Sequence, residues 1–166
     1  MIVTEQQYDK LNQRYEEYKE AGLPNLDPGL IRAVKLINQI DGLVSIFGCE
    51  GHFHQDGGQE YYIIMVCRDH TAYAMLHNIF LNVANRIAAK HALQLSHFHL
   101  IWPIYGEEQF WYPVVKLGYT YDANTYRKFE KHKHWFSRTL QDAIKSVINK
   151  LKLPPVELSA ESAGQI

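Results

Sequence analysis

The sequence predicts an α+β fold, in which an antiparallel sheet of about four strands, arranged as two hairpins, is covered by helices. The expected order of elements is α-α-β-β-α-β-β-α. Two observations lead to this prediction. Long segments that repeat apolar residues at three- and four-residue steps are typical of helices, and shorter alternating segments are typical of strands. The strand-like segments occur in adjacent pairs, and adjacent strands joined by a short turn pair antiparallel.

The first two helices are predicted from the signals at their ends. Thr4 to Gln7 has the pattern of a capping box, and Gly22 with Pro24 ends this helix. Asp27-Pro28 is typical of an N-cap followed by proline at the first helical position, and Gly42 closes the second helix. The residues expected to face the core are Tyr8, Leu11, Tyr15 and Tyr18 in the first helix and Leu30, Ile31, Val34, Ile37 and Ile40 in the second.

The first hairpin is expected to join residues 43–49 to residues 61–67. Strict alternation along a strand puts Phe47 and Cys49 on one face. The same alternation puts Val44 and Ile46 on the other face. Because Cys49 and Cys67 then end antiparallel strands at opposite ends, roughly 20 Å apart, we expect neither a disulfide nor a shared metal between them.

The second half of the chain predicts one further helix, a hairpin and a long last helix. Asp69 or Thr71 is expected to cap the helix. The hairpin is expected to join residues 96–104 to residues 110–121, and Pro113 in its second strand indicates an edge or a bulge. The last helix spans about residues 124–151. The expected buried residues are Ala72, Leu76, Ile79, Val83 and Ile87 in the earlier helix and Phe129, Phe136, Leu140, Ile144, Val147 and Leu151 in the last.

Composition places the chain among ordinary globular proteins. It has 166 residues, 46% of them hydrophobic, and a net charge of −1, which gives no overall electrostatic case for nucleic acid. Only two cysteines and no signal-like start favour a cytoplasmic protein. Its apolar runs are too short to cross a bilayer. We expect residues 1–153 to form a single domain and residues 154–166 to form a disordered tail.

The loop after the first strand gathers chemically reactive side chains. Cys49, Glu50 and His52 are the candidate catalytic residues, and His54 is a candidate ligand-binding residue. The C-x2-H-x-H spacing offers donors to zinc or another transition metal, with an open position for water and Glu50 or Glu60 as a base. A buried cysteine beside two exposed loop histidines is the alternative interpretation. Gly51 and Gly48 bracket Cys49, which indicates positive φ or a close approach of the backbone to a ligand.

The last helix carries basic residues along one side. Arg127, Lys131, His134 and Arg138 recur at three- and four-residue steps, so they can contact phosphates, with Trp135 nearby for stacking. Two alternatives remain open. The stripe can be a solvated helix face, or it can pair with the acidic first helix, within the molecule or across an oligomer. The acidic residues of that helix are Glu5, Asp9, Glu16, Glu17 and Glu20.

Residues 30–66 resemble a segment of the methyltransferases of wybutosine synthesis on transfer RNA. In both, a helix ends in an asparagine, a strand leads to a serine-, cysteine- and glycine-containing loop, and an apolar strand returns. The matching residues are Asn38, Ser45, Cys49 and Gly51. Gly48 and His52 depart from the family, which has serine and arginine there. The resemblance implies that Ser45, Cys49 and Gly51 line a cleft for S-adenosylmethionine and a tRNA base, unless the loop is kept as a feature of the fold alone.

Together these features favour a small cytosolic domain that binds a nucleotide-type or nucleic-acid ligand through the Cys49 loop and the basic stripe. The cofactor, the metal and the presence of catalysis stay open. The alternative is a non-enzymatic protein-interaction or inhibitor protein of the kind that phages and mobile elements encode, acting as a homodimer or on a protein partner. The concentrated loop favours the first hypothesis, and the lack of a strong catalytic signature favours the second.

Overall fold

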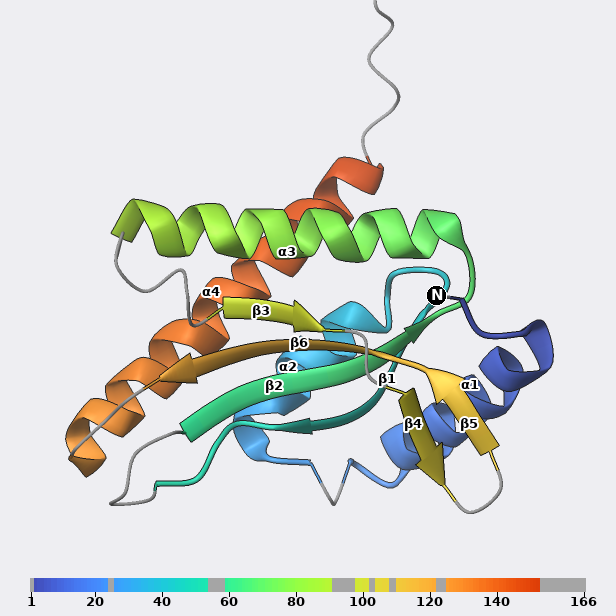
Figure 1. Ribbon diagram of the computed structural model, residues 1–166, viewed down its shortest axis with the longest axis horizontal. Coiled ribbons are helices and arrows are strands. Elements are labelled where there is room, and N and C mark those ends of the chain that lie inside the picture. The colour runs from blue at the N-terminus through green and yellow to red at the C-terminus, as the bar shows by residue number, and fades with distance from the viewer. Residues whose placement is uncertain are drawn as a thin grey trace, which may run out of the picture.

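The computed structural model describes residues 2–23, 26–53, 59–90, 98–101, 104–107, 110–121 and 125–152. It has the mixed helix-and-strand architecture that the sequence predicts (Figure 1). Its elements are α1 (Glu5–Glu20), α2 (Pro28–Ile37), β1 (Leu43–Cys49), β2 (Gln59–Cys67), α3 (His70–Lys90), β3 (Phe98–Ile101), β4 (Ile104–Glu107), β5 (Phe110–Pro113), β6 (Val115–Tyr121) and α4 (Tyr126–Lys152). The predicted order is wrong after α3, where four short strands replace the two expected.

The extra strands arise because the second hairpin is divided. Strand β3 pairs with β6 in a four-stranded antiparallel sheet of order β1-β2-β6-β3, whereas β4 pairs with β5 in a separate ribbon. The pairs Ile101↔Lys116 and Ile104↔Pro113 keep the same register across the division. The two ribbons are therefore one long hairpin. It is interrupted at Val114, directly after Pro113, which has no amide hydrogen for a ladder bond.

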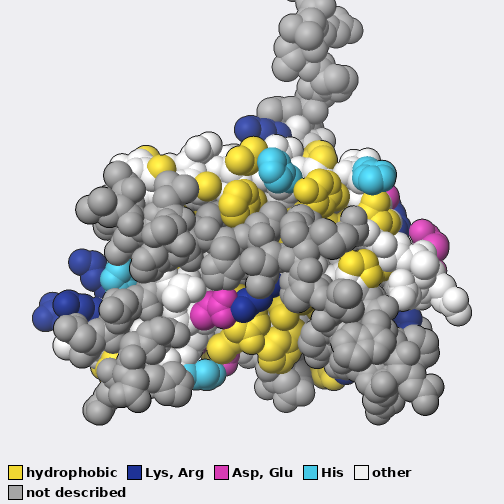
Figure 2. Space-filling model, viewed as in Figure 1, with side chains coloured by type: hydrophobic (Ala, Val, Ile, Leu, Met, Phe, Trp, Pro, Cys, Tyr) yellow, Lys and Arg dark blue, Asp and Glu magenta, His cyan; other side chains and the backbone are white. Residues whose placement is uncertain are grey.

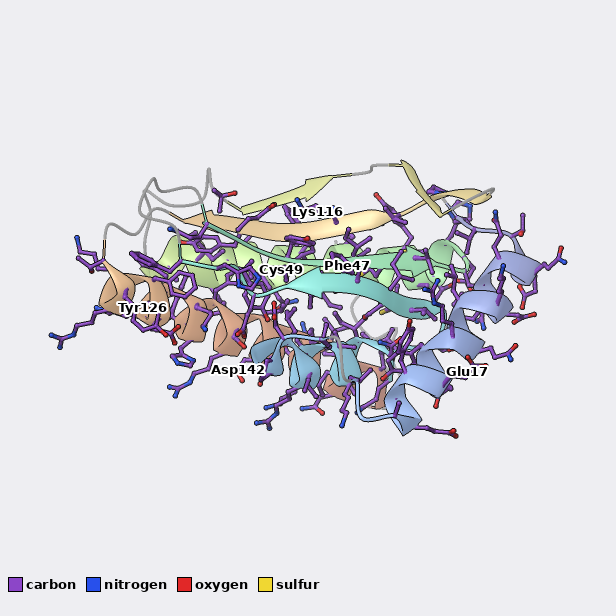
Figure 3. The ribbon with its side chains drawn as sticks, turned by 90° about the horizontal axis from the view of Figure 1, so that it is seen from below. Glu17, Phe47, Cys49, Lys116, Tyr126 and Asp142 are labelled. Carbon is purple, nitrogen blue, oxygen red and sulfur yellow. The ribbon has the colours of Figure 1, made fainter. Side chains whose placement is uncertain are left out.

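One face of the four-stranded sheet packs against the helices. The rings of Tyr61 and Tyr119 lie against Phe136 of α4, with centroid distances of 4.9 and 4.7 Å. All three side chains are fully buried. Figure 3 shows α1, α2 and α4 together on one side of the sheet. The opposite face carries Phe47, Tyr62 and Lys116, which remain partly exposed.

A β-bulge in β1 changes which side chains of that strand share a face of the sheet. The register of β1 against β2 shifts between Ser45 and Phe47, so Ile46 is the extra residue. Phe47 and Cys49 share a face as predicted, because their partners on β2 lie two residues apart. Val44 lies on that same face rather than the opposite one, because the bulge reverses the alternation between Val44 and Phe47.

The starts of α1 and α3 follow the predicted signals, whereas α2 ends at Ile37 and not at the predicted Gly42. Thr4 forms a complete capping box with Gln7 at the start of α1. Of the two candidate caps for α3, Asp69 is the residue that caps, because its Oδ1 accepts a hydrogen bond of 2.8 Å from the amide of Ala72. The predicted core residues are buried with three exceptions: Ile31 is partly buried, and Tyr18 and Leu151 are 39% and 50% exposed.

Two further predictions concern the cysteines and the membrane. Leu43 pairs with Cys67 and Cys49 pairs with Tyr62, so the two thiols stand at opposite ends of the hairpin, and both are free. None of the helices in the described ranges combines the length and the apolar character needed to cross a membrane. The predicted tail, residues 154–166, lies outside the described residues.

Candidate functional site

Three elements meet at the loop that follows β1: the end of β1, the start of α2 and the middle of α4. A Cβ atom on Gly48 would stand 3.0 Å from the carbonyl oxygen of Tyr62 and 3.1 Å from Leu30 Cδ1, so glycine lets α2 pack closely on the strand. Gly51 has φ 83° and donates its amide to Cys49 Sγ at 3.3 Å. Gly51 thus has the predicted positive φ, whereas the close approach at Gly48 is to α2 and the neighbouring strand.

Asp27 joins the loop to α2. It occupies the N-cap position, but its side chain does not cap its own helix. Its Oδ2 instead accepts a hydrogen bond of 2.9 Å from the amide of Glu50. The ligand atoms of Asp27, Cys49 and His52 all lie within 4.8 Å of one another, and His52 is exposed. Asp27 thus joins Cys49 and His52, while the predicted His54 lies outside the described residues.

The environment of Cys49 keeps its sulfur protonated. Burial raises the pKa of the Cys49 thiol, and the neighbouring carboxylates of Asp27 and Glu50 raise it further. The amide of Gly51 opposes this rise without outweighing it. Since the thiolate is the nucleophilic form of cysteine, Cys49 is not activated as a nucleophile in this arrangement.

Glu50 links the loop to α4. A Cβ atom on Gly29 would overlap Glu50 Oε2, so the carboxylate lies over the first turn of α2. Its other oxygen lies 3.4 Å from the Nζ of Lys133, which also contacts Glu130 at 2.8 Å. Burial alone would lower the pKa of Lys133, but the carboxylates of Glu130 and Glu50 outweigh it and leave the pKa raised. Lys133 therefore stays charged between its two acidic partners.

Tyr61 lies beneath this loop and is fully buried. Burial raises the pKa of Tyr61 strongly, and the charges of Glu50 and Asp27 add to the rise. The hydroxyl group makes no hydrogen bond of good geometry within the described part of the chain. Ser137 is near enough to oppose the rise in part, although its own hydroxyl donates to Gly29 O at 3.1 Å.

Ser45, a predicted ligand-binding residue, does not join the loop. It is 7% exposed and lies on the sheet face that packs against the helices. Its amide donates to Asn38 Oδ1 at 3.1 Å, and Asn38 Nδ2 donates to Ser45 Oγ at 3.0 Å. The residues that carry the family resemblance therefore form two pairs. Asn38 with Ser45 ties the end of α2 to β1, and Cys49 with Gly51 shapes the loop.

The chain matches no protein-family model and no curated protein. Among solved structures it is similar to one described as "Structure of PH1069 protein from Pyrococcus horikoshii", at 12% identity and a TM-score of 0.41, over 90% of this chain and 96% of that one. A score of this size supports no functional argument, and the resemblance to wybutosine-synthesis enzymes stays a prediction.

The four residues of the predicted basic stripe are all exposed along α4: Arg127, Lys131, His134 and Arg138. Within the described ranges, the one ion pair that any of them makes is between His134 and Glu130, at 3.3 Å. The alternative of pairing with α1 inside the molecule is therefore wrong for these residues. Figure 3 shows the reason, because Glu17 of α1 and Tyr126 of α4 lie at opposite ends of the molecule.

The position of Trp135 differs from the one predicted for it beside the basic stripe. Its ring contacts Tyr119 of β6 edge-on at a centroid distance of 5.9 Å, so it packs against the sheet instead of standing beside the stripe. Sequence reasoning also missed Asp27, Tyr61 and Lys133 as members of the loop site. Asp27 was assigned only as a helix cap, and no local signal distinguishes Tyr61 or Lys133 from the residues around them.

Proposed function

We propose that the protein binds a nucleotide-type or nucleic-acid ligand whose phosphates contact the outer side of α2 and α4. The separation of charge is the observation that carries this proposal. Helices α2 and α4 together hold ten Lys and Arg but two Asp and Glu, although the whole chain has a net charge of −1. A cationic surface on a nearly neutral protein attracts polyanions locally while the rest of the molecule does not.

The cationic face consists of exposed basic residues of α2 and of the first half of α4: Arg32, Lys35, Arg127, Lys128, Lys131 and Arg138. Helices α2 and α4 pack against each other, and the hydrogen bond from Ser137 to Gly29 O joins them. Nitrogen-tipped side chains extend from both helices away from the sheet (Figure 3). Lysine and arginine at such positions contact phosphate groups without reading base sequence.

The start of α2 is not where we expect a phosphate group. A helix N-terminus with free amides is a common anion site. Here the carboxylate of Glu50 lies over Gly29, and the carboxylate of Asp27 lies beside it. Two negative charges would repel a phosphate group at this position, so the proposed contacts lie along the exposed sides of the helices.

The test is a titration of a labelled single-stranded oligonucleotide, followed by fluorescence anisotropy at several salt concentrations. Reversing Lys131→Glu and Arg138→Glu together should weaken binding at least tenfold. It should also reduce the slope of the logarithm of the binding constant against the logarithm of the salt concentration, by the amount expected for the loss of about two phosphate contacts. The fold should remain, because both side chains are exposed. Circular dichroism and thermal unfolding check that the variant is folded.

A matched control applies the same charge change elsewhere. Lys10→Glu with Arg86→Glu alters exposed residues of α1 and α3 and should leave binding near the wild-type level. Equal losses in both double variants would mean that total charge, not this face, governs binding. A mononucleotide in a parallel titration separates the two ligand types. No salt-dependent binding of either ligand would overturn the proposal.

A second candidate function is self-association through the exposed sheet face. The observation that favours it is Phe47, which is 50% exposed and contacts Tyr62 at a centroid distance of 6.1 Å. Beside them Lys116 and Glu60 form an ion pair of 2.7 Å, so the patch has no free charge to offer a phosphate. Figure 2 shows apolar side chains gathered on this side of the molecule next to acidic and basic groups. A neutral, partly apolar surface suits a second copy of the chain better than a nucleic acid.

A further inference from the structure

We propose that Asp27, Cys49 and His52 form a binding site for Zn²⁺. Their side chains come from two separate segments, the start of α2 and the loop after β1, and their ligand atoms lie within 4.8 Å of one another. This site goes beyond the proposed binding of nucleotides or nucleic acid. It uses none of the exposed basic residues of α2 and α4 on which that proposal depends.

The donor set selects the class of metal. A thiol, an imidazole and a carboxylate are the three ligand types that Zn²⁺ takes in proteins, at about 2.3, 2.0 and 2.1 Å. Ca²⁺ and Mg²⁺ require oxygen ligands almost exclusively, so a site with sulfur and nitrogen excludes them. Three protein ligands leave a fourth position open, which is the arrangement of zinc sites that bind water or a substrate.

The present spacing needs only a small adjustment. Around a tetrahedral zinc ion the ligand atoms stand about 3.3–3.6 Å apart, as follows from the bond lengths. His52 is exposed on the loop, so its side chain can move toward Asp27 and Cys49 without breaking a packed core. The two other ligands are only partly buried, which leaves the ion a path from solvent.

Backbone amides already hold two of the three proposed ligands, Asp27 and Cys49, in place. The amide of Glu50 donates to Asp27 Oδ2, and the amide of Gly51 donates to Cys49 Sγ. Hydrogen bonds of this kind orient the first ligands of metal sites and are part of their design. They also explain why Asp27 occupies an N-cap position without capping its helix. Its carboxylate is turned toward the loop instead.

A second, independent observation is the buried hydroxyl group of Tyr61. It makes no hydrogen bond of good geometry within the described residues, and the charges of Glu50 and Asp27 act on it by adding to the rise in its pKa. A buried polar group without a partner costs free energy unless another group or a bound water satisfies it. In a metal site at this position, the hydroxyl group of Tyr61 can donate a hydrogen bond to a carboxylate ligand.

The experiment is a zinc titration of the full chain in competition with a chromophoric chelator. We expect one tightly bound Zn²⁺ per chain. His52→Ala, Cys49→Ala and Asp27→Asn should each weaken binding at least tenfold. Asparagine keeps a side-chain oxygen that can accept from the amide of Glu50, so Asp27→Asn removes the charged ligand without removing this hydrogen bond. With Co²⁺ in place of zinc, the thiolate-to-cobalt absorption should vanish in Cys49→Ala.

Control variants separate this site from adventitious binding, because the chain has nine histidines. His70→Ala and Cys67→Ala remove a histidine and the other cysteine outside the cluster and should bind zinc as the wild type does. Since His52 is exposed, His52→Ala should fold even if Cys49→Ala does not. Wild-type affinity in His52→Ala, or no stoichiometric binding by the wild type, would overturn the proposal. Lys131→Glu with Arg138→Glu should retain zinc, which keeps this result separate from the test of nucleic-acid binding.

Discussion

At the scale of single residues, one inserted residue decides which side chains can act together. Ser45 and Cys49 are four positions apart, so a regular strand would put them on the same face. The bulge at Ile46 places Ser45 on the face that packs against the helices and Cys49 on the opposite face. The two residues that the resemblance groups in one cleft therefore lie on opposite faces of the sheet. Ser45 exchanges two hydrogen bonds with Asn38.

The pair of Asn38 and Ser45 yields a prediction about stability. Asn38→Ala removes the acceptor of the Ser45 amide and the donor to Ser45 Oγ, which leaves polar groups of the buried Ser45 without these partners, whereas Val34 O keeps the backbone amide of residue 38. We expect a loss of about 1–3 kcal/mol in the free energy of unfolding, measured with urea. Gln39→Ala, at the exposed neighbouring position, is the control and should change it by less than about 0.5 kcal/mol.

Ser45→Ala distinguishes a structural role from a binding role. It should cost less than Asn38→Ala, because the Ser45 amide keeps its acceptor and Asn38 keeps Val34 O. It should leave oligonucleotide and zinc binding unchanged. A loss of either binding with an intact fold would show that Ser45 contacts a ligand after all.

The sequence predicted part of the candidate site and missed the rest for a definite reason. Cys49, Glu50 and His52 are neighbours in the chain, so any loop keeps them close. Asp27 hydrogen-bonds to Glu50 from 23 residues away, and Lys133 reaches the same Glu50 from 83 residues away. Periodicity shows which face of a helix is buried, but it does not show which distant residue that face will meet.

At the scale of elements, helices were predicted better than strands. Caps and three- or four-residue periodicity are local signals, and the starts of α1 and α3 carried both. The strands depended on longer-range pairing. The division of the second hairpin at Val114 and the bulge at Ile46 change the pairing without changing the local pattern of apolar residues. Pro113 was the sign of an irregularity that the sequence prediction used.

The cap of α3 gives a prediction with a definite pH dependence. The amide of Ala72, followed by the guanidinium of Arg68, lowers the pKa of Asp69 in the folded protein. A lowered folded pKa means that Asp69 stabilises the fold above its unfolded pKa of about 3.9, and that this contribution disappears as pH falls through the folded pKa. Asp69→Ala should therefore cost about 1 kcal/mol at pH 7 and much less below pH ~3.

Urea unfolding of the wild type and two variants across this pH range checks the sign. Asp69→Asn keeps an oxygen that can accept from Ala72 but cannot titrate, so its stability should lack the acid-induced loss that Asp69 causes. The wild type should approach the Asn variant at low pH. A constant difference between the wild type and Asp69→Ala at all pH values would show that the charge of Asp69 is not involved.

At the scale of the whole molecule, the layered arrangement separates three surfaces of different character. The outer side of α2 and α4 is cationic, the loop beside it holds the Asp27, Cys49 and His52 cluster, and the opposite side of the sheet exposes Phe47. A net charge of −1 hides this separation, because the acidic residues lie mostly outside α2 and α4. Net charge alone therefore gives no case for or against a polyanionic ligand, since such a ligand responds to the local field.

The last prediction separates the two candidate functions through Phe47. If the exposed sheet face joins two copies of the chain, each Phe47 contacts the same patch on the other copy, as a two-fold interface requires. The mass measured by sedimentation equilibrium should then rise with concentration, and Phe47→Glu should return it to that of the monomer. Because Phe47 is half exposed, this variant should keep the stability of the monomer within about 0.5 kcal/mol.

Leu81→Glu introduces the same charge at a leucine of α3 that is 44% exposed, and should leave the association intact. A wild type that stays monomeric at every concentration, or a Phe47→Glu variant that associates as the wild type does, would eliminate this interface and leave nucleic-acid binding as the remaining candidate.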